Sequence, residues 1–405
     1  MSVSIEDIRA AAALIEGEVV RTPTVRSGPL SAALGADVFL KLETLQFTGS
    51  FKDRGALVKL KSLTPNEMAR GVIAISAGNH AQGVAYHAQR LGIPATIVMP
   101  EGTPFNKVRR TQAFGAEVVL HGDNISAAEP FAHTLSEKEK LTFVHPYDDE
   151  RIIAGQGTVG LELLEDVPDL DTIIVPIGGG GIISGTATAA KYLKPEIEII
   201  GVESEFYPTM FNAVRGENLP VGGDSIAEGI AVKSAGMITR AIIAELVDEI
   251  LVVSESAIES AVQSMLNDAK IHTEGAGASP LAALRENIDR FAGKRVALIA
   301  CGGNIDSRIL ASILMRGLSR EGYLARLRIT ISDQPGVLAK VAQQIGEAGG
   351  NIVEIYHHRM FYDVPLKLAE LDAVVETRDA THSDEIMQRL EAIGFPTRRL
   401  EDGAA

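Results

Sequence analysis

The chain has 405 residues, 46% of them hydrophobic and 22% charged, which is the composition of a globular protein and excludes a disordered one. This length suggests two or three domains. The formal net charge of −15, with 53 acidic against 38 basic residues, argues against a nucleic-acid-binding surface.

The single cysteine, Cys301, excludes an internal disulfide and suits a reducing compartment. The first residues carry Glu6 and Asp7 and lack the basic and apolar regions of a signal peptide. No apolar run approaches the ~20 residues of a membrane span. We therefore expect a cytoplasmic protein with no membrane or nucleic-acid partner.

Short strands and helices alternate over roughly residues 1–320. The strands lack strict polar alternation, which is typical of buried parallel sheets joined by right-handed crossovers. The predicted fold class is therefore α/β, with two open twisted sheets, helices on both faces and ligands at the carboxyl ends of the strands. The predicted strands are 38–43, 72–75, 95–99, 117–120, 172–175, 198–202, 250–253 and 296–300, and the main predicted helices are 5–15, 50–60, 80–91, 105–114, 149–164 and 182–191.

The sequence pattern changes near residue 324. Residues 326–331 alternate with period two, and the order that follows is β-α-β-β-α with a last strand at 398–400, which is a ferredoxin-like α+β pattern. The expected domains are residues 1–320, a linker at 321–325 and residues 326–405. A smaller subdomain at about 45–146 is expected to be inserted in the first domain.

The stretch Thr48–Ala56 follows the first of these strands and opens a helix. Ser50 is a good N-cap and Asp53 stands where a capping box places an acid, so Lys52 falls in the first helical turn. The positive end of the helix lowers the pKa of a lysine there, as an amine that attacks a carbonyl requires. The alternative is a lysine that simply extends its amine to water.

The run of four glycines at Gly178–Gly181 lies between a predicted strand and a predicted helix. Without Cβ atoms, backbone amides can turn inward at a helix start and bind an anion such as a phosphate. A dinucleotide site is an alternative, but the spacing is not Gly-x-Gly-x-x-Gly and no Lys-Ser/Thr of a P-loop follows. An ordinary tight turn would not need four glycines.

Ser76–His80 and Cys301–Asn304 also follow apolar runs. Together with the lysine helix and the glycine run, they resemble in order and spacing the fold-type II pyridoxal-phosphate enzymes. Within that group the threonine ammonia-lyases (threonine dehydratases) and serine racemases are most similar. The resemblance covers roughly residues 1–320 and implies pyridoxal 5′-phosphate as the cofactor.

The resemblance assigns roles to single residues. Lys52 would hold the cofactor as a Schiff base and then act as the base at Cα, and Phe51 would pack on one ring face. Gly178, Gly179, Gly180 and Gly181 would bind the phosphate. Asn79 would donate to the ring oxygen, although a helix cap is its alternative. The stretch 227–232 would line the ring edge through Gly229, and 145–149 would pack across the cleft, with Asp148 or Asp149 alternatively capping a helix.

The turn formed by Ser76, Ala77, Gly78, Asn79 and His80 would bind the substrate carboxylate at a helix start. Serine racemases carry a serine at the position of Ala77, as the second proton donor, so alanine argues against racemisation. Cys301 is either a small core residue or, by the resemblance, faces the pyridine nitrogen. A neutral thiol there favours expulsion of a β-hydroxyl over transamination.

No metal site is expected. Related enzymes bind a divalent cation near a Gly-Val-Glu stretch, but residues 204–209 after Glu203 lack the second acid. The histidines show no ligand spacing.

The C-terminal part resembles an ACT domain, a regulatory module that usually binds amino acids. The resemblance rests on the turn Asp333–Gly336 and on Asn351 after two glycines. It places an effector site, formed between two such domains, at Asp333, Gly336, Val337, Asn351 and Ile352. Isoleucine or valine is the expected effector, and a homodimer or homotetramer the expected assembly.

The predicted function is deamination of L-threonine, and secondarily of L-serine, by β-elimination of water. The nearest alternatives are a racemase and a lyase for another β-hydroxy amino acid such as hydroxyaspartate. Two alternatives from other classes are a catalytically silent amino-acid sensor and a nucleotide-binding module.

Overall fold

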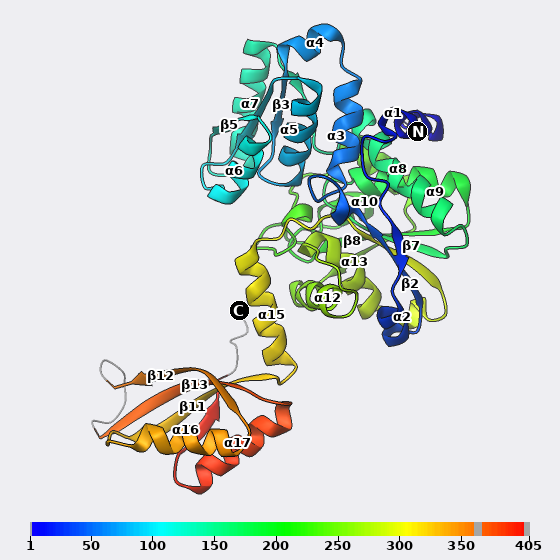
Figure 1. Cartoon of the computed structure of the whole chain (residues 1–405). Helices are drawn as coiled ribbons and strands as arrows, with labels where there is room; N and C mark the ends of the chain where they lie inside the picture. The colour runs from blue at the N-terminus through cyan, green and yellow to red at the C-terminus, as the bar shows by residue number, and fades with distance from the viewer. Residues whose placement is uncertain (1, 360–366, 401–405) are drawn as a thin grey trace. The chain divides into compact units, whose positions relative to one another are not determined.

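The computed structural model describes residues 2–359 and 367–400, and the chain divides into two units, Met1–Ile305 and Asp306–Ala405 (Figure 1). The first unit holds two mainly parallel sheets, and the second holds one antiparallel sheet. Across the described ranges, no helix has both the length and the apolar character needed to cross a bilayer.

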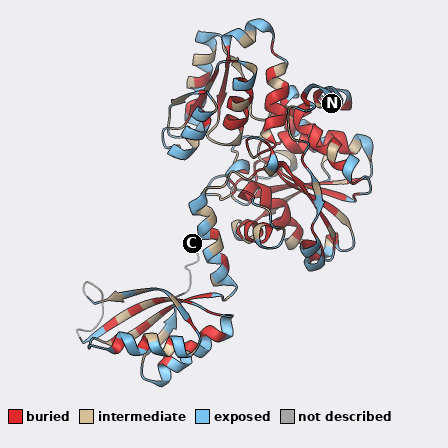
Figure 2. Ribbon diagram, viewed as in Figure 1, coloured by how far each residue is buried: buried red, intermediate tan, exposed pale blue. Residues whose placement is uncertain are grey.

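The larger sheet of the first unit has six strands in the order β1-β2-β10-β7-β8-β9. All neighbours are parallel except β1 and β2. Every residue of the central strand β7 is buried, on both faces of the sheet (Figure 2). Each fully buried isoleucine or valine there contributes about 1.5–3 kcal/mol. The strands are β1 (Thr24–Arg26), β2 (Asp37–Leu42), β7 (Thr172–Pro176), β8 (Glu198–Ser204), β9 (Glu249–Val253) and β10 (Arg295–Ala300).

The smaller sheet has four parallel strands in the order β5-β4-β3-β6. The strands are β3 (Val72–Ile75), β4 (Ala95–Met99), β5 (Glu117–Leu120) and β6 (Thr142–Phe143). The first three are confirmed at their predicted bounds. Strands β1 and β6 were not predicted, because three and two residues are too few to show a period.

Helices surround both sheets. They are α1 (Ile5–Ile15), α2 (Gly28–Leu34), α3 (Lys52–Lys61), α4 (Pro65–Arg70), α5 (Asn79–Leu91), α6 (Phe105–Ala113), α7 (Ile125–Glu139), α8 (Glu150–Asp166), α9 (Gly181–Leu193), α10 (Thr209–Arg215), α11 (Met237–Leu246), α12 (Glu255–Asn267), α13 (Gly275–Glu286) and α14 (Ile288–Phe291). Two short 3-10 helices lie at Glu43–Leu45 and Glu228–Ile230. The predicted two-sheet α/β architecture is confirmed.

Glycines let α3, α8 and α9 approach one another closely. A Cβ atom on Gly155 of α8 would lie 2.6 Å from the Cα atom of Gly55 on α3. A Cβ atom on Gly185 of α9 would lie 2.4 Å from the backbone nitrogen of Gly157 on α8. A larger residue at these positions would force the helices apart. The packing therefore holds the helix that begins at Lys52 at a fixed place relative to the helix that follows the glycine run.

The second unit has an antiparallel sheet in the order β12-β13-β11-β14. Its elements are α15 (Ser307–Arg320), β11 (Leu324–Ser332), α16 (Val337–Glu347), β12 (Asn351–His358), β13 (Leu368–Glu376), α17 (Ala380–Ala392) and β14 (Thr397–Arg399). Alternate residues of β11 and β13 are buried in one core with apolar residues of α16 and α17. The ferredoxin-like prediction is confirmed. The division at residue 305 lies before α15, whereas the change of sequence pattern lies after it.

Candidate active site

Helix α3 begins at Lys52, so the prediction that this lysine lies in the first turn is confirmed. The predicted N-cap at Ser50 is wrong. Phe51 is the N-cap residue, its backbone is already helical, and the Ser50 hydroxyl has no hydrogen-bond partner in the described part of the chain. The predicted capping acid, Asp53, instead accepts hydrogen bonds from the backbone N–H (3.0 Å) and the hydroxyl of Thr48.

The segment before the lysine is attached to the end of β10. The N–H of Phe51 donates to the carbonyl of Cys301 (3.0 Å), and the N–H of Gly303 donates to the carbonyl of Gly49 (2.9 Å). These bonds place Cys301 beside Lys52. Burial raises the pKa of the Cys301 thiol well above its ordinary value, so the thiol is neutral.

The amine of Lys52 is a donor without an anionic partner. Its Nζ donates to the carbonyl of Pro146 (2.6 Å), and no carboxylate of the described residues forms an ion pair with it. Burial lowers the pKa of Lys52 to about 8, although Cys301 and Glu274 oppose the shift. The predicted direction of the shift is confirmed, but its main cause is desolvation rather than the helix end. Much of the amine is neutral near pH 8.

The run Gly178–Gly181 forms the bend between β7 and α9. No side chain fits at its centre, because a Cβ atom on Gly179 would lie 2.1 Å from the ring of Tyr147, and Gly180 has a left-handed φ of +91°. None of the described residues accepts a hydrogen bond from the N–H groups of these glycines. Because a helix start also carries positive partial charge, the bend is a suitable site for a phosphate.

We expect Gly179→Ala to lower the free energy of unfolding by about 1–3 kcal/mol, because the added methyl group must displace the Tyr147 ring. Gly28→Ala is the matched control, since nothing lies within 4 Å of a Cβ atom at that position, and it should be neutral or slightly stabilising. Urea unfolding followed by circular dichroism compares the variants. Equal stability of the two would contradict the crowding at Gly179.

Asp148 and Asp149 both cap helices, as the alternative interpretation of these residues proposed. Asp149 is the N-cap of α8, and the carboxylate of Asp148 accepts hydrogen bonds from the first three N–H groups of α11. Thr239, in the first turn of α11, donates its hydroxyl to the carbonyl of Gly179 (2.7 Å). Helix α11 and the segment 145–149 thus both contact the glycine bend.

Asn79 begins α5, but its side chain is not a helix cap. The N-cap residue is Gly78, and the Nδ2 of Asn79 donates to Glu274 (2.8 Å) while its Oδ1 accepts from Asn304 (2.7 Å). The hydroxyl of Ser76 accepts from the N–H of Gly78 (3.1 Å). A hydroxyl in this position keeps its own hydrogen to donate, for example to a carboxylate.

Helix α5 brings the turn before it next to the lysine. A Cβ atom on Gly83 would lie 3.3 Å from the backbone of Lys52. His80 lies with its Nε2 2.9 Å from the carbonyl of Val144, and burial lowers its pKa to about 3, so the imidazole is neutral. Ala77 is half-buried in the same turn and carries no titratable hydrogen.

Gly229 lies close to both Glu274 and Gly178. A Cβ atom on Gly229 would lie 3.0 Å from Glu274, and one on Gly178 would lie 3.0 Å from the carbonyl of Gly229. The predicted cofactor-binding residues therefore surround one site. They are Phe51, Lys52, Asn79, Gly178, Gly179, Gly180, Gly181, Gly229 and Cys301.

Two residues of this site were not predicted. Tyr147 packs on the glycine bend, and its hydroxyl donates to the carbonyl of Ser234 (3.0 Å). It belongs to the stretch 145–149, which was expected to pack across the cleft, but Tyr147 itself was not predicted as a site residue. Glu274 is buried beside Asn79 and had no local signal.

The carboxylate of Glu203 is hydrogen-bonded to backbone N–H groups. Its two oxygens accept hydrogen bonds from the N–H groups of Met210 and Phe211, at 2.8 Å each, near the start of α10. Within residues 2–359 and 367–400, no group of histidine, cysteine, aspartate and glutamate residues is arranged to hold a metal ion.

The predicted effector residues fall into two groups within one chain. Asp333, Gly336 and Val337 lie at the turn between β11 and α16, and Asn351 and Ile352 lie at the start of β12. In the sheet, Ser332, the residue before this turn, pairs with Leu368, the first residue of β13. Asn351, the first residue of β12, pairs with Glu376, the last residue of β13. The two groups are therefore separated by the length of β13, about 26 Å at 3.3 Å per residue.

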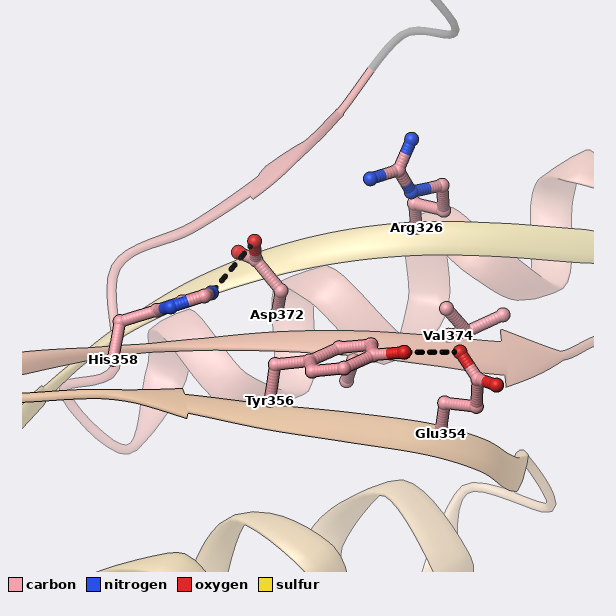
Figure 3. Close-up of a pocket in the computed structure, with 7 residues that line it drawn as sticks. Arg326, Glu354, Tyr356, His358, Asp372 and Val374 are labelled. Atoms are coloured by element: carbon pink, nitrogen blue, oxygen red, sulfur yellow. Dashed lines mark hydrogen bonds and ion pairs between the residues drawn. The ribbon is translucent and has the colours of Figure 1, made fainter.

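A hollow of about 350 Å³ opens on the face of this sheet that does not carry the core (Figure 3). Side chains from β11, β12 and β13 line it. They include Arg326, Glu354, Tyr356, His358, Asp372 and Val374. Asp372 accepts from His358 (3.0 Å) and from the Nε and Nη2 groups of Arg328 (2.6 and 2.7 Å). None of the predicted effector residues lines this hollow.

Comparisons with known proteins agree with this geometry. Residues 15–302 match the model of the family described as "Pyridoxal-phosphate dependent enzyme", and residues 319–394 match the model of the ACT domain. An L-threonine ammonia-lyase of Thermotoga maritima is 42% identical over 398 residues, which covers 98% of this chain and 99% of that protein.

Solved structures of a threonine deaminase and of a serine racemase are similar to this chain. Threonine deaminase isoform 2 of Solanum lycopersicum is 34% identical with a TM-score of 0.72, covering 76% of this chain and 86% of that one. The maize serine racemase is 34% identical with a TM-score of 0.73, covering 79% of this chain and 99% of that one. The chain therefore belongs to the threonine ammonia-lyases, within the family of pyridoxal-phosphate-dependent enzymes, and carries an ACT domain in its C-terminal part.

Proposed function

We propose that this chain deaminates L-threonine to 2-oxobutanoate and ammonia, and L-serine to pyruvate and ammonia, by β-elimination of water. A relative that matches nearly the whole length of this chain is an L-threonine ammonia-lyase. The observation that carries the proposal is the state of Lys52. Its amine has no ion pair among the described residues, has a pKa of about 8 and lies among the glycine bend, Asn79 and Cys301.

Pyridoxal 5′-phosphate is the cofactor of this family, and the residues of the site fit it. The glycine bend offers N–H groups without acceptors to the phosphate, and Lys52 offers a neutral amine to the aldehyde. Cys301 offers an uncharged thiol, which by the family resemblance would face the ring nitrogen. When bound, the cofactor supplies the electron sink that makes the Cα proton of the amino acid acidic.

Individual residues of the site would bind the substrate and transfer its proton. The turn Ser76–His80 would bind the substrate carboxylate at the start of α5. The Nζ of Lys52 would take the proton from Cα, since an amine with a pKa near 8 suits proton transfer near neutral pH. The β-hydroxyl would gain one proton, which balances the proton removed from Cα, and leave as water. The released enamine would then take up one water to give the 2-oxo acid and ammonia. Ala77 provides no second proton donor, which disfavours racemisation.

The pKa of Lys52 predicts how fast the apo-protein takes up its cofactor. Only the neutral amine attacks an aldehyde, so below pH 8 the initial rate should rise about tenfold per pH unit, and above pH 8 it should level off. The rate is measured as borohydride-fixed adduct on the Lys52 peptide by mass spectrometry, between pH 6 and 10. A rate that keeps rising tenfold per unit to pH 10 would mean an ordinary exposed lysine.

We propose that residues 326–405 regulate the activity of residues 1–320 by binding an amino acid, with isoleucine or valine as the first candidates. Because the two groups of predicted effector residues lie at opposite ends of one sheet, a ligand that touches both would need two copies of the domain. This supports a homodimer or homotetramer. Whether the bound amino acid activates or inhibits the enzyme depends on which of the two states of the enzyme it binds more tightly.

A cytoplasmic location is part of the proposal, supported by the unpaired, buried Cys301. The main alternative activity is racemisation, which the similarity to the maize serine racemase favours and Ala77 opposes.

Purified protein with pyridoxal 5′-phosphate should be incubated separately with L-threonine, L-serine and hydroxyaspartate, with and without isoleucine or valine. The 2-oxo acid and the D-isomer are assayed in each mixture. We expect the 2-oxo acid from threonine to form fastest and no D-isomer to accumulate. D-serine as the main product would establish the racemase, and absence of any product would favour an amino-acid sensor.

A further inference from the structure

Glu274 is a buried carboxyl group that the proposed reaction does not use. It is the N-cap residue of α13, yet its side chain makes no cap hydrogen bond there. Its Oε1 instead accepts a hydrogen bond from the Nδ2 of Asn79 (2.8 Å), and its backbone N–H donates to the carbonyl of Gly302 (3.0 Å). The carboxyl group therefore lies between the start of α5 and the end of β10, at the edge of the site.

Hydrogen-bond accounting fixes the orientation of the Asn79 amide. The Nδ2 of Asn304 donates to the carbonyl of Thr48 (2.7 Å) and to the Oδ1 of Asn79 (2.7 Å), so Asn304 uses both of its hydrogens as a donor. The oxygen of Asn79 must then face Asn304, and its nitrogen must face Glu274. Turning the Asn79 amide over would place one NH₂ group against another.

One hydrogen of Asn79 remains after this accounting. An amide nitrogen carries two hydrogens, one of which goes to Glu274, and the second has no acceptor among the described residues. With both the oxygen and the first hydrogen engaged, the second N–H has a fixed direction. Asn79 thus offers a single, preoriented donor in the same site as Lys52 and Gly229.

The residues around Glu274 favour a hydrogen bond between its carboxyl group and Asn79. A Cβ atom on Gly302 would lie 2.8 Å from Oε1, and one on Gly229 would lie 3.0 Å from it, so a side chain at either position would crowd the carboxyl group. Burial raises the pKa of Glu274 to about 7, while Asn79 and the backbone of Asn304 oppose the shift. Oε1 can accept from Asn79 whether the carboxyl group is ionised or neutral.

We propose that Glu274 is a positioning residue that holds the Asn79 amide so that its free N–H donates to the bound pyridoxal 5′-phosphate. The inference rests on the proposed function, because it assumes that this site binds the cofactor as the family resemblance implies. Glu274 acts through Asn79 and has no direct role in the reaction.

The test is a double-mutant cycle on the apo-protein, with the dissociation constant of pyridoxal 5′-phosphate measured by absorbance titration. Loss of one hydrogen bond to a charged group corresponds to about a 10-fold weaker affinity, so we expect that loss for Glu274→Ala and at least as much for Asn79→Ala. In the Asn79→Ala background, Glu274→Ala should cost less than about 3-fold more, because residues that act through one contact are not additive. The visible absorption band should shift alike in both single variants.

Glu274→Gln and Glu286→Ala complete the design. Glutamine keeps the acceptor oxygen, so its affinity should stay within about 3-fold of the wild type, and this variant decides the matter if Glu274→Ala does not fold. Glu286, at the far end of the same helix, is the matched control, and its alanine variant should bind normally.

Wild-type affinity and an unshifted band in Glu274→Ala would overturn the proposal. So would full multiplication of the two single losses, or a 10-fold loss in Glu274→Gln. A merely structural role would lower the thermal midpoint of the apo-protein and leave the band in place. If the wild type binds the cofactor but releases no 2-oxo acid from threonine, the proposed function fails while these binding measurements still decide the role of Glu274.

Discussion

The Lys52→Ala variant is expected to lose at least about 1,000-fold in the release of 2-oxobutanoate from threonine, because one amine both attaches the cofactor and takes the Cα proton. The structure leaves no substitute, since the described residues place no second lysine amine among the contacts that join the glycine bend, Asn79 and Cys301. Oxo-acid release is followed continuously under saturating cofactor. Reduction by borohydride and mass spectrometry should find the label on the peptide that carries Lys52 in the wild type and on no peptide in the variant.

Lys61→Ala is the matched control on the same helix. The amine of Lys61 donates to the carbonyl of Leu14 (3.0 Å) and pairs with Glu18 near the surface. A pair of this kind contributes about 0–1 kcal/mol, so turnover should stay at the wild-type level. Full activity in Lys52→Ala, or a label on a different side chain, would remove the basis of the proposed reaction.

The parts of the fold that could be predicted are those in which local pattern and burial agree. Strands β3 and β4 are short apolar runs flanked by helices, and their bounds matched because parallel strands inside a sheet are buried on both faces. The bounds of β5 also matched, although this edge strand is only partly buried. Lys52 and the glycine bend could be predicted for a similar reason, since each lies where a strand or turn ends and a helix begins. Their roles came from the resemblance to a family.

The rest depends on contacts between distant parts of the chain. The prediction of an N-cap at Ser50 was wrong because Ser50 forms an isolated β-bridge with Gly302, which fixes the backbone conformation there. No local sequence pattern indicates that bridge. Glu274 lies 195 residues from Asn79 in the sequence, and a lone glutamate before a helix carries no sign of its partner. The division at residue 305 likewise depends on how α15 packs rather than on composition.

The least predictable feature is a buried network of charges next to the lysine helix. Arg54, two residues after Lys52, has no exposed surface and pairs with Glu43 (2.8 Å) and Glu162 (2.6 Å). Lys41, also fully buried, pairs with Glu162 (2.6 Å) and donates to the carbonyl of Thr22 (2.7 Å). In the sequence these residues are ordinary charges. In the fold they join β2, α3 and α8.

Arg54→Met should therefore lower the free energy of unfolding by about 3–5 kcal/mol at pH 7, because it leaves the buried Glu43 without its partner. Arg21→Met is the matched control. Arg21 is exposed and pairs with Glu165 and Asp166 at the surface, so its loss should cost no more than about 1 kcal/mol. Both are measured by urea unfolding, and equal losses in the two variants would contradict a special role of the buried network.

The pH dependence of this loss has a defined sign. Burial alone would raise the pKa of Glu43, but its attraction to Arg54 and their hydrogen bonds outweigh burial, so the pKa of Glu43 is lowered. In the wild type this group stabilises the fold above its ordinary pKa of about 4.5, and the stabilisation is lost as the pH falls. Without Arg54 the folded pKa is raised, so stability is lost as the pH rises. The difference in free energy of unfolding between the wild type and Arg54→Met should increase from pH 4 to pH 7. Adding Glu43→Gln to the Arg54→Met variant should recover part of the lost stability, because this substitution removes the unpaired buried charge.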